Sequence, residues 1–512
     1  MATPRKLKDF GELTPAERKV LAELDSGELT VLGDGERPAV DAGPDRLIRP
    51  AFLRWCALGA DEEHRVHETG VRISGALIAN DTQADKAGWK NHLDLAGCAL
   101  NFDLGLENCL FAVAPVLRSV VLRNLFLNGS ELPGLRADRL RATGSAFFRK
   151  IKTIGEFRLV GANIEGNLSF VGAVFLNVGG KAVSANRLQV GGGVFLRDGA
   201  RISGILNLTG ANISAIVDDP VCWPEPGDLR LNRCRYGAFH GKGVSAEERI
   251  RWLTLQDPSR FGEGFWPQPW EQCAKVLRDM GHPKDAREVL IEKERLQRQD
   301  ARRRLEQQLR EARLERQRIS ADGPSNAALA AQAPIPPLWL LLWTTRFRDA
   351  LLAVTIRYGH RPFGALWWLG GFWLVGACLF LAAYNADAMK PKSPVVLRSA
   401  EWALCAAQPE TMVSFARGAP AASRRRAGES RIGCFLAAPE GAGYPAFNAA
   451  LYSADVILPL FDLEQQAHWV PDSTQGGGLG KWAMAFVYIE IIAGWALSLL
   501  AVAGFSGLVK KE

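Results

Sequence analysis

A self-match in the first half of the sequence constrains the fold of this chain more than any other feature. The segment GEFRLVGANIEGNLSF, residues 155–170, recurs as GVFLRDGARISGILNL, residues 193–208. Seven positions keep the same residue in the two copies, three of them glycines. Repeats of about 20 to 50 residues are typical of solenoids, in which each coil buries its apolar face only against the next coil. The period of about 38 residues predicts two coils of roughly 19 to 20 residues each.

Short apolar alternations interrupted by glycine extend this pattern over residues 66–243. Alternation with turn residues predicts short β-strands, and glycine permits the corners between them. The triplet at residues 191–193 is expected at such a corner and not in a phosphate loop, because no helix follows it. We therefore predict a mainly β fold, a right-handed β-helix of pentapeptide-like repeats. The alternative, a β-sandwich, does not explain a register that holds at seven positions.

Two apolar stretches in the last quarter, residues 365–384 and 482–509, are each long enough to cross a bilayer as a helix. Arginines precede the first stretch, and Lys510 and Lys511 follow the second. Positive charge marks the cytoplasmic side, so both termini are expected inside and the loop 385–480 outside. The N-terminus lacks the apolar segment of a secretion signal, which also predicts a cytoplasmic solenoid.

The remaining segments predict helices and a linker. We expect a helical N-terminal cap at 1–65, a helical hairpin with a charged rod at 246–320, a linker with an interfacial helix at 321–362, and a two-span α-helical membrane domain at 363–512. Thr14 and Glu17 have the spacing of a capping box, with proline at the first helical position. The rod is rich in Arg, Glu and Gln, so we expect it to be solvated; contact with anionic headgroups is the second interpretation.

Eight of the nine cysteines fall into two groups. Six lie in the part expected inside the cell and lack CxxC spacing, so they are predicted to be buried free thiols: Cys56, Cys98, Cys109, Cys222, Cys234 and Cys273. Cys405 and Cys434 both lie in the loop expected outside. Outside the cell a disulfide between these two residues is expected to persist.

Three carboxylates are candidates for a role within the membrane. Glu490 is the ionisable residue of the second span, where a carboxylate suggests a proton or cation relay or an interhelical hydrogen bond. The alternative is that Glu490 snorkels or is protonated near the interface. Asp455 and Asp462 flank Pro459 in the apolar segment Tyr444–Trp469. If this segment re-enters the membrane, the aspartates would line a cation pathway. If it is an interfacial helix, the aspartates are exposed to solvent.

No motif in the sequence predicts catalysis or a cofactor. There is no G-x-S-x-G, HExxH, P-loop or G-x-G-x-x-G, and the seven histidines show no metal-binding spacing beyond the pair His64 and His67. A surface loop is the expected place for that pair. We therefore expect no metal and no cofactor, and we favour a role other than an enzyme.

Several motifs resemble those of a known family. They are the VxISGxL and GANIxGNLxF repeats, the stretches FWPQPWEQCAKVLRDMGHPKDAREVLI and NAALYSADVILPLFDLEQQAHWVP, and the terminal IIAGWALSLLAVAGFSGLV. Together they resemble a family of uncharacterised bacterial membrane proteins with pentapeptide-like repeats, whose members are often labelled membrane-associated oxidoreductases. The resemblance covers the chain from about residue 45 and implies a bacterial inner membrane protein. It also implies a distant likeness to two-span channel modules, and it carries over no functional residue.

Three functions follow as hypotheses. The first is a membrane-anchored solenoid that acts as an interaction or scaffold module and binds an unknown protein partner at the cytoplasmic face. The second is a subunit of a homo-oligomeric two-span ion channel or transporter. The third, an oxidoreductase, rests on the family label alone, because no nicotinamide, flavin, haem or iron–sulfur motif is present. Besides the lipid bilayer we expect no nucleic-acid partner.

Overall fold

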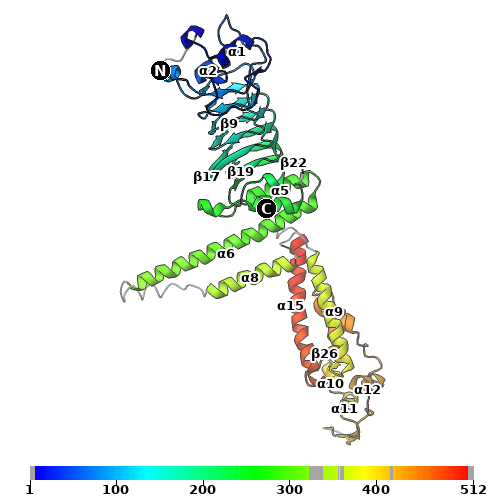
Figure 1. Cartoon of the computed structure of the whole chain (residues 1–512). Helices are drawn as coiled ribbons and strands as arrows, with labels where there is room; N and C mark the ends of the chain where they lie inside the picture. Colours follow the sequence, from blue (N-terminus) through cyan, green and yellow to red (C-terminus); the bar gives the residue numbers. More distant parts are fainter. Residues whose placement is uncertain are drawn as a thin grey trace. The chain divides into compact units, whose positions relative to one another are not determined.

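The computed structural model describes residues 6–241, 243–321, 338–355, 357, 363–415 and 419–505. The chain forms two compact units, Met1–Arg304 and Leu305–Glu512. Figure 1 shows a solenoid of stacked strands in the first unit and long helices in the second. Each unit is described by itself.

The first unit is a β-solenoid of about six turns, as the sequence predicts. Its strands form two sheets whose pairs are all parallel, which is the arrangement that results when each coil stacks on the next. The 12-stranded sheet contains β1 (Thr30–Val31), β3 (Val71–Ser74), β5 (Leu104–Glu107), β7 (Val121–Leu122), β8 (Leu125–Phe126), β11 (Arg141–Ala142), β12 (Ala146–Phe147), β15 (Asn163–Ile164), β16 (Leu168–Ser169), β18 (Gln189–Leu196), β20 (Asn212–Asp218) and β22 (Arg235–Gly241). The 10-stranded sheet contains β2 (Leu47–Ile48), β4 (Leu77–Ile78), β6 (Leu110–Phe111), β9 (Glu131–Leu132), β10 (Leu135–Arg136), β13 (Lys152–Thr153), β14 (Phe157–Arg158), β17 (Val174–Ser184), β19 (Arg201–Asn207) and β21 (Leu229–Arg230).

The predicted coil length is wrong, because the coils are longer. Asn124, Ser145 and Asn167 precede paired strands of consecutive coils, and the hydrogen bonds that join them have sequence separations of 21 and 22. The 38-residue repeat aligns Phe157, which lies in the 10-stranded sheet, with Phe195, which lies in the 12-stranded sheet. The repeat therefore spans one and a half coils. Both sheets turn Leu, Ile and Phe inward with the same alternation. A repeat of this kind therefore cannot distinguish a whole coil from a half coil.

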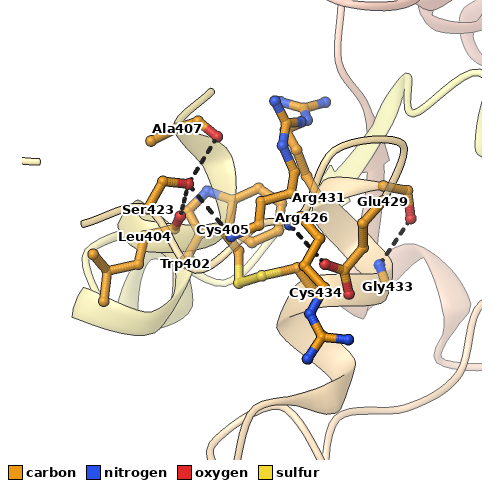
Figure 2. The surroundings of a disulfide bond; sticks show 12 residues. Trp402, Leu404, Cys405, Ala407, Ser423, Arg426, Glu429, Arg431, Gly433 and Cys434 are labelled. Carbon is orange, nitrogen blue, oxygen red and sulfur yellow. Dashed lines mark hydrogen bonds between the residues drawn. A yellow bond between two sulfur atoms is a disulfide. The ribbon is translucent and has the colours of Figure 1, made fainter. Parts of the chain in front are cut away.

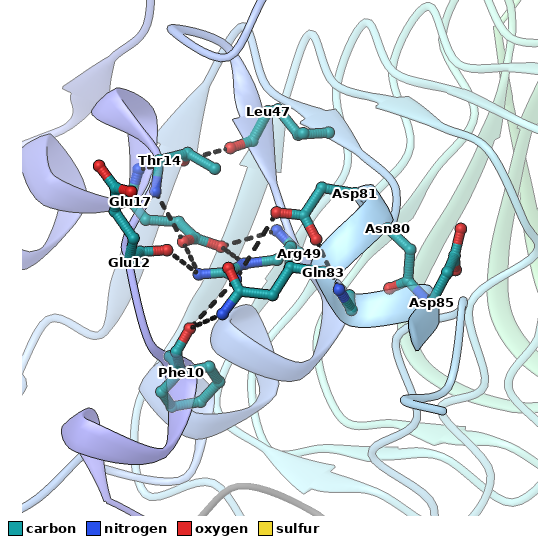
Figure 3. A network of polar contacts seen from close by, with 11 residues as sticks. Phe10, Glu12, Thr14, Glu17, Leu47, Arg49, Asn80, Asp81, Gln83 and Asp85 are labelled. Carbon is teal, nitrogen blue, oxygen red and sulfur yellow. Dashed lines mark hydrogen bonds and ion pairs between the residues drawn. The ribbon is translucent and has the colours of Figure 1, made fainter. Parts of the chain in front are cut away.

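A helical cap closes the N-terminal end of the solenoid. It comprises η1 (Leu7–Phe10), α1 (Pro15–Glu23), α2 (Pro50–Ala57) and α3 (Thr82–Lys86). The capping box predicted at Thr14 and Glu17 is present. Figure 3 shows Arg49 at the centre of a polar network, paired with Glu17 at 2.5 Å and donating to Phe10 O at 3.2 Å. Because β1 and β2 already belong to the sheets, the solenoid begins before residue 66; two-residue strands leave no alternation for sequence analysis to detect.

Helices also close the other end. After η2 (Pro220–Cys222) they are α4 (Ala246–Thr254), η3 (Pro258–Phe261), α5 (Pro267–Asp279) and α6 (Pro283–Ala321). Gln268 and Gln272 of α5 donate to the carbonyls of Cys234 and Tyr236, so side chains occupy acceptors next to the last strand. A fully buried pair between Arg249 and Asp218 joins α4 to β20.

The thiols of the first unit mostly follow the prediction. Cys56, Cys109, Cys222, Cys234 and Cys273 are free and buried, whereas Cys98 is half-buried. The solenoid core supplies the reason, because its Leu, Ile, Val and Phe side chains leave these positions without access to water. Burial raises the pKa of Cys109, Cys234 and Cys273 to about 12.

The second unit contains two helices that are long and apolar enough to cross a membrane, Gly364–Asn385 and Gly476–Ala503. They correspond to α9 (Gly364–Asn385) and α15 (Leu479–Phe505), and most of their surface is exposed. Residues 506–509 of the predicted second span and residues 322–337 of the predicted linker lie outside the described residues. Before α9 comes α8 (Leu338–Thr355). Between α9 and α15 lie β23 (Met389–Pro391), α10 (Pro394–Leu397), α11 (Ala400–Ala406), β24 (Met412–Val413), β25 (Ala421–Ala422), α12 (Arg431–Ala437), α13 (Ala449–Ile457), α14 (Gln465–His468), β26 (Trp469–Pro471) and η4 (Gly476–Gly478).

Candidate functional site

The segment Tyr444–Trp469 forms a hairpin between the two apolar helices. It begins as α13 and returns as an irregular stretch, residues 458–464, that leads into α14. The two ends of the hairpin meet, because the rings of Tyr444 and Trp469 lie 5.4 Å apart and the Tyr444 hydroxyl donates to His468 O at 2.6 Å. The segment thus enters and leaves at the same end of α9 and α15.

The hairpin lies along the apolar helices. Near its start the ring of Tyr452 packs against Phe380 of α9. At its inner end Ile457 packs with Leu369 of α9 and Leu497 of α15. Leu369 lies about 24 Å before the end of α9, measured along the helix. An interfacial helix would contact only the helix ends, so this packing favours the re-entrant interpretation of the segment.

Glu490 lies at the contact between α15 and α13 and is completely buried. Its Oε1 lies 2.5 Å from the hydroxyl of Ser453, which lies 2.9 Å from Trp373 O. A Cβ at Gly376 would come within 2.2 Å of the same carboxylate oxygen, so glycine makes room for it. The interhelical hydrogen bond expected of Glu490 is therefore present, and the snorkelling interpretation is wrong because the side chain does not reach the surface.

Asp455 has a different role from the pathway lining considered for it. The side chain is 5% exposed. Oδ1 accepts from Leu463 N at 2.7 Å and Oδ2 from Gln466 N at 2.8 Å. Both carboxylate oxygens are thus occupied by the backbone of the returning stretch. Asp455 fixes the shape of the hairpin, and it does not face a pathway in a single copy.

The returning stretch carries exposed carboxylates and main-chain carbonyls without a described hydrogen-bond donor. Asp462 and Glu464 are both exposed, and Asp462 Oδ1 accepts from Glu464 N at 2.9 Å. Among the residues that the structure describes, none donates a hydrogen bond to the five carbonyls of residues 459–463. The neighbouring side chains Leu460 and Phe461 are 81% and 65% exposed. The sequence predicts a role for Asp462 but gives no signal for Glu464 or the carbonyls, because only the fold shows which groups remain without a described partner.

A cluster of charges holds the loop between α9 and α15 to both of these helices. Arg431 of α12 pairs with Asp387, just after α9, at 3.1 Å and with Asp472, just before α15, at 3.0 Å. Burial alone would raise the pKa of Asp472, but hydrogen bonds from Thr474 and Arg431 bring it below its ordinary value. The arginine thereby ties the ends of the two helices to one loop.

The disulfide lies next to this cluster. Cys405 of α11 and Cys434 of α12 are joined, with 5.6 Å between their Cα atoms. Figure 2 shows the bridge beside Trp402 and Arg431, and the rings of Trp402 and Phe435 pack edge to face at 5.6 Å. The bridge closes the loop that carries Arg431.

Comparisons with known proteins do not assign this chain to a family. No family model, no curated protein and no solved structure matches the chain. Within the described residues no group of three His, Cys, Asp or Glu side chains could hold a metal ion. The fold itself defines the class: a β-solenoid joined to a unit with two helices that are able to span a membrane.

Proposed function

We propose that this chain is a subunit of an oligomeric membrane pore that conducts cations. The observation that carries the proposal is the exposed, irregular stretch 458–464 at the inner end of the hairpin. Irregular backbone at membrane depth is tolerated only where protein covers it or where it lines a water-filled cavity. Among the residues that the structure describes, none covers Leu460 and Phe461 in one copy, so neighbouring copies around an axis would supply the cover.

The chemistry of the hairpin supports cations as the permeating species. Carbonyl oxygens and carboxylates are the groups that replace the hydration shell of cations in selectivity filters. Here five consecutive carbonyls without a described donor lie beside the exposed carboxylates of Asp462 and Glu464. The C-terminal end of α13 precedes this stretch, and the C-terminal end of a helix carries partial negative charge. All three features favour positive charge at the same place.

The location proposed for the pore is the inner membrane of a bacterium, with both termini in the cytoplasm. The solenoid would then act at the cytoplasmic face as the module that assembles subunits or binds partners. A scaffold role alone does not require a re-entrant hairpin between the spans, which is why the pore is the preferred function. Nothing in the site supports an oxidoreductase.

The test is cation flux through the purified full-length chain in liposomes. We expect potassium flux, and we expect the double variant Asp462→Asn, Glu464→Gln to lose most of its preference for cations over chloride. Glu410→Gln removes an exposed carboxylate of the loop between α9 and α15 and serves as the control. A chain that is monomeric in detergent and in the bilayer, or flux that is indifferent to the double variant, would contradict the proposal.

A further inference from the structure

One corner of the solenoid carries a line of arginines. It lies where the chain passes from the 10-stranded sheet to the 12-stranded sheet. Backbone hydrogen bonds between consecutive coils place the following residues at equivalent positions of this corner: Ser119, Arg139, Gly161, Arg187, Gly210 and Arg233. Arg139, Arg187 and Arg233, here called the arginine ridge, are therefore two coils apart, or about 9.5 Å at the usual strand spacing.

The backbone at these positions does not favour arginine. The φ angles of Arg139, Arg187 and Arg233 are 56°, 55° and 59°, in the left-handed region. Glycine fits this region without strain, and asparagine fits it better than other residues with a side chain. Glycine does stand at the two intervening coils. The stems of Arg139 and Arg187 lie beside Gly161 and Gly210 of the next coil, whereas their guanidinium groups form no ion pair with the described residues there. Backbone strain of this kind points to a function for the charged ends.

The guanidinium groups of the ridge are free to bind. All three arginines are exposed, and none forms an ion pair with a carboxylate of the described chain. Three more exposed arginines without such a pair flank the ridge: Arg136, Arg141 and Arg235. Asp138, the residue before Arg139, is already paired with Arg158 at 3.3 Å.

The opposite corner of the solenoid differs in charge. There Lys150 and Asp198 have the corresponding left-handed conformation, with φ of 52° and 55°. Asp198 pairs with its neighbour Arg197 at 3.2 Å, so that corner mixes both signs. Arg149, Lys150 and Arg197 still give that corner a net positive charge, but it carries fewer arginines than the ridge and its flanks, and one of its cations is paired.

We propose that the arginine ridge binds an acidic polypeptide segment. Carboxylates seven residues apart on one face of an α-helix are about 10.5 Å apart, close to the interval between the ridge arginines. Surfaces that bind single-stranded nucleic acid add aromatic platforms, and membrane-surface helices add inserted apolar side chains. In the row of outward residues beside the ridge, three amides, Asn163, Gln189 and Asn212, instead lie between Arg141 and Arg235. Amides and arginines together suit carboxylates.

The test measures binding of fluorescent polyglutamate to the full chain in neutral-lipid nanodiscs. The triple variant Arg139→Asn, Arg187→Asn, Arg233→Asn should bind at least tenfold more weakly, and binding by the native chain should weaken with salt. The matched control removes three positive charges from the opposite corner through Arg149→Gln, Lys150→Asn and Arg197→Gln. It should change the affinity less than twofold.

Other outcomes would overturn the inference. Equal losses in both variants would mean that only net charge matters. Tighter, ridge-dependent binding of single-stranded DNA or of anionic-lipid nanodiscs would identify a different class of partner. The melting temperature of the ridge variant should be unchanged or higher, because asparagine accepts the left-handed conformation; a lower value would assign the arginines to packing.

Discussion

The carboxyl group of Glu490 in α15 lies 2.5 Å from the hydroxyl of Ser453 in α13, with no exposed surface. The same hydroxyl lies 2.9 Å from Trp373 O in α9. The side chain of Ser453 therefore links α9, α13 and α15. Its single proton cannot serve two acceptors at once. The serine therefore donates to only one of these two oxygens at a time, and Glu490 Oε2 has no described hydrogen-bond partner.

The first prediction concerns this link. Ser453→Ala leaves the buried Glu490 carboxyl without its partner, and we expect the unfolding free energy to fall by about 1–3 kcal/mol. The double variant Ser453→Ala, Glu490→Leu removes both partners and should recover most of that loss. Unfolding in mixed detergent micelles, followed by circular dichroism, gives the double-mutant cycle. Additive losses would show that the two side chains do not interact.

The second prediction concerns the space beside Glu490. A methyl group at Gly376 would lie 2.2 Å from Glu490 Oε1 and 2.5 Å from Ser453 Oγ. Gly376→Ala should therefore displace α13 and cost about 1–3 kcal/mol in unfolding free energy. Gly370→Ala on the same helix is the control, because nothing described lies within 4 Å of its added methyl group. Equal stability of the two variants in the same micelles would contradict the close packing of α13 on α9.

The sequence predicts the architecture of this chain better than the roles of the residues in the candidate site. Alternating apolar residues and glycines indicate a solenoid because every coil repeats the same local pattern. The contact between Ser453 and Trp373 joins residues 80 positions apart. No local pattern predicts such a contact, so the sequence could name Glu490, Asp455 and Asp462 but could not assign their roles. Asp455 and Asp462 have the same side chain and similar neighbours; only the returning backbone makes one structural and leaves the other exposed.

The third prediction concerns the disulfide. Cys405 and Cys434 close a loop with a sequence separation of 29 residues, and the chain-entropy relation gives about 3.5 kcal/mol for a loop of this size. Reductant should lower the melting temperature of the native chain and leave that of the variant Cys405→Ala, Cys434→Ala unchanged. Thiol labelling of the denatured, unreduced chain should not modify either cysteine. Modification without reduction would exclude the bridge.

The fourth prediction concerns pH. Burial raises the pKa of Asp472, but the hydrogen bonds from Thr474 and Arg431 lower it by more, so the pKa is below its ordinary value. A carboxylate with a depressed folded pKa stabilises the fold at pH values above its unfolded pKa of about 3.9. This contribution is lost as the pH falls through the lower, folded value. Melting of the native chain should therefore become less cooperative or shift downward below about pH 4. In Asp472→Asn this part of the pH dependence should be absent, and a profile identical to that of the native chain would contradict the role of Asp472.

The last prediction separates the two aspartates of the hairpin. Asp455→Asn replaces a carboxylate that accepts two backbone N–H groups with an amide that offers one acceptor oxygen. We expect this variant to lose about 1.5–3 kcal/mol, the usual contribution of a hydrogen bond to a charged group. Asp462→Asn affects an exposed residue and should leave stability within about 0.5 kcal/mol. The effects on cation selectivity in liposomes should be the opposite of the effects on stability. Asp455→Asn protein that folds should keep the preference for cations over chloride, whereas Asp462→Asn should have a weaker preference. Loss of stability in Asp462→Asn, or loss of selectivity in folded Asp455→Asn alone, would show that the roles are exchanged and that the returning stretch has a different arrangement in the assembled pore.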